Sequence, residues 1–239
     1  MDVNKNSYTF TFAAVMVIVV AALLSFAATS LKPIQDDNVR KEKMQSILRS
    51  VKIDVDRDQA EKDYKKYIKQ ELVIRDGKLV DDVKAFTIDL SKEVAKPVEE
   101  RNAPLYVAEK EGKTYYIIPL RGKGLWGPIW GYMSLEGDVN TVYGTIFDHK
   151  GETPGLGAEI TTPMFSEQFV EKKILNADKE FVSIQVRKGD ASGDYQVNGI
   201  SGGTITSTGV QNMIEDITRA YYPFLLEYSK KGGAVASAE

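Results

Sequence analysis

LYVAEKEGKTYYIIPL, residues 105–120, is the stretch that predicts the fold. Its two halves are rich in aromatic and β-branched residues, and Glu111-Gly112-Lys113 between them is typical of a hairpin turn. Two further runs of this kind follow at residues 129–135 and 141–147, separated from their neighbours by Gly and Asp. The sequence therefore predicts a mostly antiparallel sheet.

Helices and one more strand are predicted on the C-terminal side. A short helix is expected around Ser166–Lys173, and FVSIQVR, residues 181–187, is expected as a strand. After Ser201-Gly202-Gly203 apolar residues recur at helical spacing, and Pro223 is expected to kink or end this last helix. Its apolar face consists of Val210, Met213, Ile214, Ile217, Ala220 and Tyr221.

The N-terminal segment is the most apolar part of the chain. Residues 8–31 are 24 residues without a formal charge. As a helix they span roughly 36 Å, enough to cross a hydrocarbon core of about 30 Å. The alternative is a secretory signal cleaved near Ser25-Phe26-Ala27, but the apolar centre of a signal is usually only about 7 to 15 residues long. The basic residues on both flanks leave the orientation of a membrane helix open.

Two amphipathic helices are predicted between the membrane segment and the sheet. Their apolar faces consist of Met44, Ile47, Leu48 and Val51, and of Ala60, Tyr64, Tyr67 and Ile68. Asp54, Asp56 and Asp58 have the alternating spacing of a calcium loop. Such a loop has Gly and Glu where this chain has Gln59 and Lys65, so a solvated helix N-terminus is the favoured interpretation.

The predicted fold class is α+β, with a single N-terminal transmembrane helix, a mostly antiparallel sheet and flanking helices. We expect a membrane anchor over residues 1–31, a charged helical connector over 32–70, a folded domain over 71–231 and a disordered tail over 232–239.

Composition excludes several kinds of chemistry. The chain has 239 residues, no Cys, one His and a net charge of −3. The absence of Cys excludes disulfides, thiolate nucleophiles and iron–sulfur clusters, and the near-neutral charge gives no reason to expect nucleic acid as a partner. We predict no catalytic side chain and no metal ligands.

Two Gly-rich segments are candidates for ligand binding. GETPGLG, residues 151–157, lets backbone pass close to a flat or anionic ligand, although a plain surface turn explains it as well. NGISGGTITSTG, residues 198–209, opens a helix and therefore offers backbone N–H groups to an anion. It lacks the spacing of a Walker loop, so a phosphate-binding loop and a Ser/Thr-rich helix cap both stay open.

Within the second segment, Ser201-Gly202-Gly203-Thr204 resembles the flavinylation motif of FMN-binding domains, and residues 152–157 resemble the other segment typical of that family. In that motif the final Thr carries the FMN phosphate as an ester. The family usually has Asp where this chain has Asn198, and Ala where it has Gly203. The resemblance thus implies covalent FMN on Thr204, with Thr206 as the second choice.

The resemblance also implies the other cofactor contacts. They are Ser201, Gly202, Gly203, Thr153, Gly155, Leu156 and Gly157. Core packing explains at least one of Trp126 and Trp130, and a flavin contact is left open for Trp126. His149 lies just before the first Gly-rich segment, where a hydrogen bond to the flavin and a structural role are both open, the latter being favoured.

Two further stretches of sequence point to one particular family of proteins with FMN-binding domains. GLWGPIWGY, residues 124–132, and LKPIQDDN, residues 31–38, resemble the family of C subunits of sodium-translocating NADH:quinone reductases. This resemblance implies an electron-relaying subunit in a bacterial inner membrane, with the FMN domain on the periplasmic side. It also implies other subunits of the complex and a flavin transferase as partners. Because residues 8–31 carry no charge, a sodium path is expected in other subunits.

Two alternative functions stay open. One is the FMN-carrying subunit of the related ferredoxin:NAD oxidoreductase complex, which shares both Gly-rich features. The other is a membrane-anchored module without redox chemistry that binds a phosphorylated ligand or a protein partner.

Overall fold

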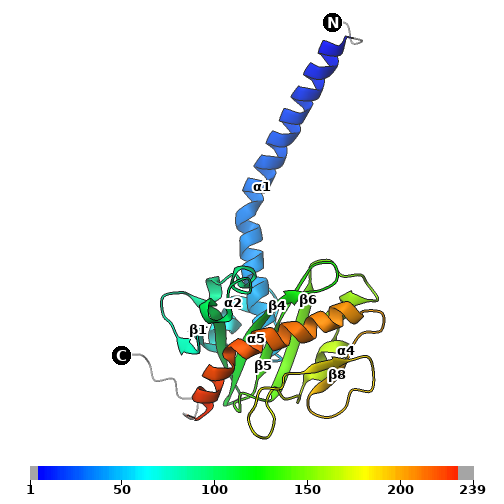
Figure 1. The fold of residues 1–239 in the computed structure, drawn as a ribbon. Helices are drawn as coiled ribbons and strands as arrows, with labels where there is room; N and C mark the ends of the chain where they lie inside the picture. The colour runs from blue at the N-terminus through cyan, green and yellow to red at the C-terminus, as the bar shows by residue number, and fades with distance from the viewer. Residues whose placement is uncertain (1–4, 231–239) are drawn as a thin grey trace. The chain divides into compact units, whose positions relative to one another are not determined.

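A six-stranded antiparallel sheet forms the centre of the computed structural model, which describes residues 5–230 (Figure 1). The order across the sheet is β2-β1-β3-β4-β5-β6, so the predicted antiparallel α+β fold is confirmed. Its strands are β1 (Ile68–Arg75), β2 (Lys78–Leu79), β3 (Ala103–Lys110), β4 (Lys113–Lys123), β5 (Pro128–Leu135) and β6 (Val142–His149). Two short parallel strands, β7 (Gln185–Arg187) and β8 (Gln196–Asn198), lie apart from it.

The predicted hairpin joins β3 to β4. Glu111 and Gly112 have φ values of +53° and +75°, the two positive values that a tight two-residue turn requires. Gly adopts such a value without strain, which fixes the register that pairs Lys110 with Lys113.

The helical elements flank the sheet. They are α1 (Asn6–Ser50), α2 (Ala60–Tyr67), α3 (Leu90–Glu93), α4 (Pro163–Ser166) and α5 (Thr204–Lys230), with short 3₁₀ turns η1 (Ala85–Thr87), η2 (Val98–Glu100), η3 (Gly157–Thr161) and η4 (Glu167–Phe169).

Helix α5 covers one face of the sheet (Figure 1). Of the six residues predicted for its apolar face, five are buried and Ala220 is partly buried. Pro223 does not end the helix, which continues to Lys230. A buried strip of this kind is what an amphipathic helix needs in order to pack on a sheet.

The opposite face of the sheet is covered by residues 44–51 and by α2. Met44, Ile47, Leu48 and Val51 are buried there, as their spacing predicted. Contacts divide the chain into two compact units, Met1–Lys43 and Met44–Glu239. The boundaries predicted at residues 31/32 and 70/71 stay predictions, and the tail 232–239 lies outside the described residues.

Helix α1 is the one helix of the described part that is long and apolar enough to cross a membrane. The uncharged residues 8–31 belong to it, and Pro33 lies inside it. The charges that follow pair along the same helix, as in Lys32 with Asp36 at 2.7 Å and Lys41 with Asp37 at 2.8 Å.

Three predicted elements are wrong in part. The second amphipathic helix ends at Tyr67, so Ile68, which was predicted on its apolar face, is the first residue of β1. Residues 166–173 do not form one helix: α4 ends at Ser166 and η4 at Phe169. The chain then pairs with the edge of β6, where Val142 N–H donates to the Lys172 carbonyl at 2.8 Å. In 181–187 only β7 is strand, because Ser183 has a φ of +59°, which interrupts extended backbone.

Candidate functional site

Three loops meet at one end of the sheet, and we call them the three-loop site: residues 124–127, 150–157 and 199–206. The first is the turn between β4 and β5, closed by the Gly124 N–H donating to the Gly127 carbonyl at 2.8 Å. The second follows β6, whose His149 pairs with Ile129 beside that turn. The third leads from β8 into α5. Antiparallel pairing thus brings the first two loops together, and the packing of α5 against β4 adds the third.

Glu152 connects the three loops. Its carboxylate accepts the Trp126 backbone N–H at 2.9 Å and the Thr206 hydroxyl at 2.5 Å. The backbone N–H groups of Leu125 and Gly127 also donate to it. The residue is only 4% exposed, so a buried charge is compensated by several donors.

These donors keep Glu152 ionised. Burial alone would raise its pKa, but the hydrogen bonds from Thr206 and from the backbone of residues 125–127 outweigh burial and hold the pKa of this carboxyl below its usual value. Three successive N–H groups around one anion form the kind of concave site that binds anions in many proteins.

The second and third loops approach each other so closely that two positions have no room for a side chain. Gly202 has a φ of +74°, and a Cβ there would lie 2.6 Å from Leu156 Cδ2. A Cβ on Gly157 would lie 2.5 Å from both Glu152 Oε2 and Thr206 Oγ1. Side chains at these two positions would separate the loops.

The loop of residues 153–156 is a tight turn of its own. The Leu156 and Ala158 N–H groups both donate to the Thr153 carbonyl at 3.1 Å. Gly155 has a φ of +74°, and its N–H donates to Glu159 Oε1 at 2.9 Å. Thr153 and Gly155 are exposed at the surface of the site.

The two candidate attachment residues differ in environment. Thr204 is exposed and is the first residue of α5, next to the exposed Ser201 and Gly202. Thr206 is 1% exposed, and its hydroxyl proton is donated to Glu152. Gly203 is buried behind them. Of the two threonines, only Thr204 therefore presents its side chain at the surface.

Apolar side chains on the same loops face solvent. Trp126 is 69% exposed and Ile205 59% exposed, and Leu125 and Leu156 are also exposed. Exposed apolar groups gathered on one surface often mark a ligand or partner site.

Two polar side chains hold the start of the third loop. The Gln168 side-chain amide pairs with both backbone groups of Asn198, accepting its N–H at 2.9 Å and donating to its carbonyl at 3.2 Å. Asn198 Oδ1 accepts the Ala191 N–H at 3.0 Å. An Asp oxygen at position 198 accepts the same bond, so the Asn of this chain preserves the loop.

Other singled-out residues have structural contacts. His149 Nδ1 accepts the Glu152 N–H at 3.1 Å, in agreement with the structural role favoured for it. Trp130 contacts Arg121, whose guanidinium lies 6.0 Å from the centre of its ring. Asp54, Asp56 and Asp58 lie in the segment before α2, and the described residues contain no group of three or more side chains able to hold a metal.

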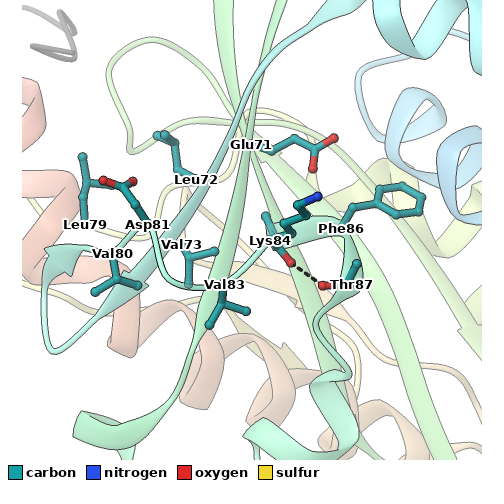
Figure 2. Close-up of a pocket in the computed structure, with 11 residues that line it drawn as sticks. Glu71, Leu72, Val73, Leu79, Val80, Asp81, Val83, Lys84, Phe86 and Thr87 are labelled. Carbon is teal, nitrogen blue, oxygen red and sulfur yellow. Dashed lines mark hydrogen bonds between the residues drawn. The ribbon is translucent and has the colours of Figure 1, made fainter. Parts of the chain in front are cut away.

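A pocket of about 280 Å³ lies elsewhere, beside β1 (Figure 2). Figure 2 shows that β1 and the segment 79–87 line it, with Glu71 and Lys84 on one side and Asp81 on the other. β3 separates β1 from the strands that carry the three-loop site. None of the predicted site residues lines this pocket.

Sequence reasoning missed three residues of the site and one residue, Gln168, that supports its third loop. Glu152 lies within a quoted motif but was not predicted as a site residue, and Leu125, Ile205 and Gln168 were not singled out. A carboxylate inside a run of Gly and Pro was a usable signal for Glu152. No local signal marks Gln168, because its partner lies 30 positions away.

Comparisons with known proteins agree with this geometry. A family model described as an FMN-binding domain matches residues 124–219, which include all three loops. The C subunit of the Na(+)-translocating NADH-quinone reductase of Haemophilus ducreyi is 31% identical, and the alignment covers 97% of this chain and 98% of that protein. The corresponding C subunit of Vibrio alginolyticus is 30% identical over 90% of this chain and 92% of its own.

A solved structure is similar over most of the chain. The crystal structure of the C subunit of the Na(+)-translocating NADH-quinone reductase of Parabacteroides distasonis has 42% sequence identity and a TM-score of 0.75. The match covers 82% of this chain and 96% of the crystallised one.

Proposed function

Because the chain belongs to the family of C subunits of Na(+)-translocating NADH-quinone reductases, we propose that it is a membrane-anchored flavoprotein subunit that relays electrons within such a complex. It carries FMN as a phosphoester on the Thr204 hydroxyl. The observation that carries this proposal is the contrast between the exposed Thr204 and the buried Thr206, whose hydroxyl is bound by Glu152.

The start of α5 fits a phosphate. The first N–H groups of a helix have no acceptor within it, and the helix dipole adds attraction for an anion. Thr204 lies at this position, and the adjacent Gly202 and Gly203 have no side chains to cover it. An ester there leaves the phosphate anion beside these donors.

The neighbouring turn does not compete for the phosphate. The N–H groups of residues 125–127 are already engaged by the Glu152 carboxylate. A second anion at that turn would meet a buried negative charge without additional donors. The helix start is therefore the better phosphate position.

The exposed apolar side chains suit the flavin ring. Trp126, Leu156 and Ile205 project from all three loops and provide surfaces against which a flat aromatic ring can pack. FMN supplies the redox chemistry when it is bound, whereas the protein holds and orients it. Electron relay requires no acid or base from the chain, in agreement with a site that has no Cys and a single nearby His engaged in the loop.

The attachment is tested by mass. The chain and its Thr204→Val and Thr206→Val variants are produced with a flavin transferase, and the tryptic peptide of residues 189–219 is weighed and fragmented. We expect the wild type and Thr206→Val to gain one FMN less one water at Thr204, and Thr204→Val to gain nothing. Flavin on Thr206, or an unmodified wild-type peptide, contradicts the assignment.

The subunit is anchored by residues 8–31 in a bacterial inner membrane, with the three-loop site on the periplasmic side. Its partners are the other subunits of the complex and, during maturation, the flavin transferase. The membrane segment has no charged side chain, so sodium need not bind to it and the ion path is assigned to those other subunits.

The orientation is tested by labelling, because the chain has no Cys. Single Cys residues are introduced by Glu99→Cys in the folded unit and Lys5→Cys before the membrane segment. A maleimide that does not cross membranes should label intact spheroplasts of the Glu99→Cys protein only, and both proteins after lysis. The reverse pattern contradicts periplasmic exposure.

A further inference from the structure

The Glu152 carboxylate is a buried charge. Electron relay does not by itself require such a charge. It lies under the exposed surface of the three-loop site and contacts each of the three loops. Its own backbone belongs to residues 150–157, Oε1 accepts from the turn at Trp126, and Oε2 accepts from Thr206 in the first turn of α5. A residue with contacts of this kind can set the relative positions of all surfaces around a ligand.

We propose that Glu152 is the positioning residue of the flavin site, which fixes the 124–127 turn against α5 and supplies a permanent negative charge beneath the bound cofactor. This rests on the proposed function, because it assigns a role toward the FMN carried on Thr204. Glu152 acts through Trp126 and Thr206 and does not itself touch the flavin surface.

The packing around the Glu152 carboxylate indicates that the neighbouring loops are adapted to it. A Cβ at Gly124 would lie 2.5 Å from Glu152 Oε1, and one at Gly157 would lie 2.5 Å from Oε2. Two loops thus have glycine where they meet the two oxygens. An incidental buried carboxylate does not require glycine on both sides.

The hydrogen bond to Thr206 has a chemical consequence. A hydroxyl has one proton to donate, and that of Thr206 is directed to Glu152 at 2.5 Å. Its oxygen is buried, so the bond removes one of two neighbouring hydroxyls from the surface that a flavin transferase meets. Glu152 in this way restricts attachment to Thr204.

The charge has a separate consequence. A fixed negative charge near a flavin opposes the addition of electrons, since reduction increases the negative charge of the cofactor. In a protein interior this interaction is screened less than in water. Glu152 therefore lowers the midpoint potential of the flavin relative to an otherwise identical site with a neutral residue.

Two substitutions of Glu152 separate its positioning role from the effect of its charge. In Glu152→Gln the amide oxygen still accepts from the 125–127 turn and the amide NH₂ faces Thr206, so contacts are largely kept while the charge is lost. In Glu152→Ala both are lost. Glu167→Gln is the control, because Glu167 is an exposed carboxylate on η4, outside the three loops.

The first measurement needs no flavin. Hydrogen exchange of the 125–127 amides is followed in the full-length protein before flavinylation. We expect exchange in Glu152→Ala to be faster by roughly tenfold or more, as for loss of a hydrogen bond to a charged group, and to be near wild type in Glu152→Gln and Glu167→Gln. Unchanged exchange in Glu152→Ala overturns the positioning role.

The second measurement uses the flavinylated proteins. We expect the midpoint potential to rise in Glu152→Gln and to stay at the wild-type value in Glu167→Gln. An unshifted potential in Glu152→Gln overturns the role of the charge, and this variant keeps the test decisive if Glu152→Ala does not fold. Absence of flavin from the wild-type protein contradicts the proposed function instead, and the exchange measurement then decides whether Glu152 connects the loops.

Discussion

Two prolines interrupt the ladder between β3 and β4. Continuing the register that pairs Tyr106 with Ile117 brings Pro104 opposite Pro119, and neither residue has an N–H to donate. The Pro104 carbonyl is instead bonded by the Tyr221 hydroxyl of α5 at 2.7 Å. A buried carbonyl without a donor is unfavourable, so this tyrosine completes the sheet from the helix layer.

We predict that Tyr221→Phe lowers the free energy of unfolding by about 1–3 kcal/mol, because the buried carbonyl loses its donor while the ring is kept. Tyr222→Phe is the control, since its hydroxyl donates to the Lys179 carbonyl at an exposed position. Its loss should be smaller than about 1 kcal/mol. Urea unfolding of residues 44–239 measures both, and equal effects contradict the prediction.

The residues of the three-loop site were partly predictable from sequence. The motif residues 201–204 and the run 152–157 carry local signals, since Gly and hydroxyl residues before a helix are unusual in a packed core. The difference between Thr204 and Thr206 was not predictable, because the burial of Thr206 depends on Glu152, 54 positions away. The spacing of residues along one helix does not identify a hydrogen-bond partner 54 positions away.

At the scale of elements, α5 lies very close to β4. A Cβ on Gly122 would lie 2.6 Å from Met213 Cβ, and a Cβ on Gly209 would collide with the Lys123 carbonyl. Both glycines mark the crossing of helix and strand. This close packing sets the first turn of α5 beside the end of β4, where the 124–127 turn begins.

We predict that Gly209→Ala destabilises the protein, although Ala is favoured over Gly in a helix by about 1 kcal/mol. The added Cβ has to displace the β4 backbone, and overpacking of this kind costs about 1–3 kcal/mol. Thr208→Ala is the matched control, because Thr208 is exposed in the same turn. Thermal unfolding should give a lower Tm for Gly209→Ala and an unchanged or higher Tm for Thr208→Ala.

Elements with strong periodicity were predictable. The β3–β4 hairpin and the apolar face of α5 follow from local patterns that packing does not override. The segments 166–173 and 181–187 were predicted less well, because their backbone is shaped by the edge of β6 and by the positive φ of Ser183. Neither feature has a signature in the local sequence.

At the scale of the whole molecule, residues 44–51 belong to the fold rather than to a linker. The Ser134 hydroxyl donates to the Ser50 carbonyl at 2.6 Å, and a Cβ at Gly144 would also meet that carbonyl. The chain thus joins the sheet at the end of β5 opposite the three-loop site. Six residue steps along β5 make this separation roughly 20 Å.

We predict that a protein starting at Met44 folds cooperatively, whereas one starting at Glu71, the first residue of the sequence-predicted domain, does not. Removal of Met44, Ile47, Leu48 and Val51 takes away four buried side chains, worth roughly 6–12 kcal/mol together. This is comparable with the whole stability of a domain, about 5–15 kcal/mol. Circular dichroism during urea unfolding measures the outcome, and a cooperative transition for residues 71–239 contradicts it.

Pro33 marks the position at which helix α1 can bend most easily. Proline has no N–H, so the Thr29 carbonyl four residues earlier has no partner within the helix. Thr29 lies near the end of the uncharged residues 8–31, and Pro33 follows just beyond them. In the proposed membrane anchor, water replaces hydrocarbon at this point and can donate to that carbonyl. Bending the helix at Pro33 breaks no further backbone hydrogen bond. Bending it within the apolar segment would break backbone hydrogen bonds that a membrane core cannot replace. The helix therefore bends most easily just beyond the proposed membrane segment.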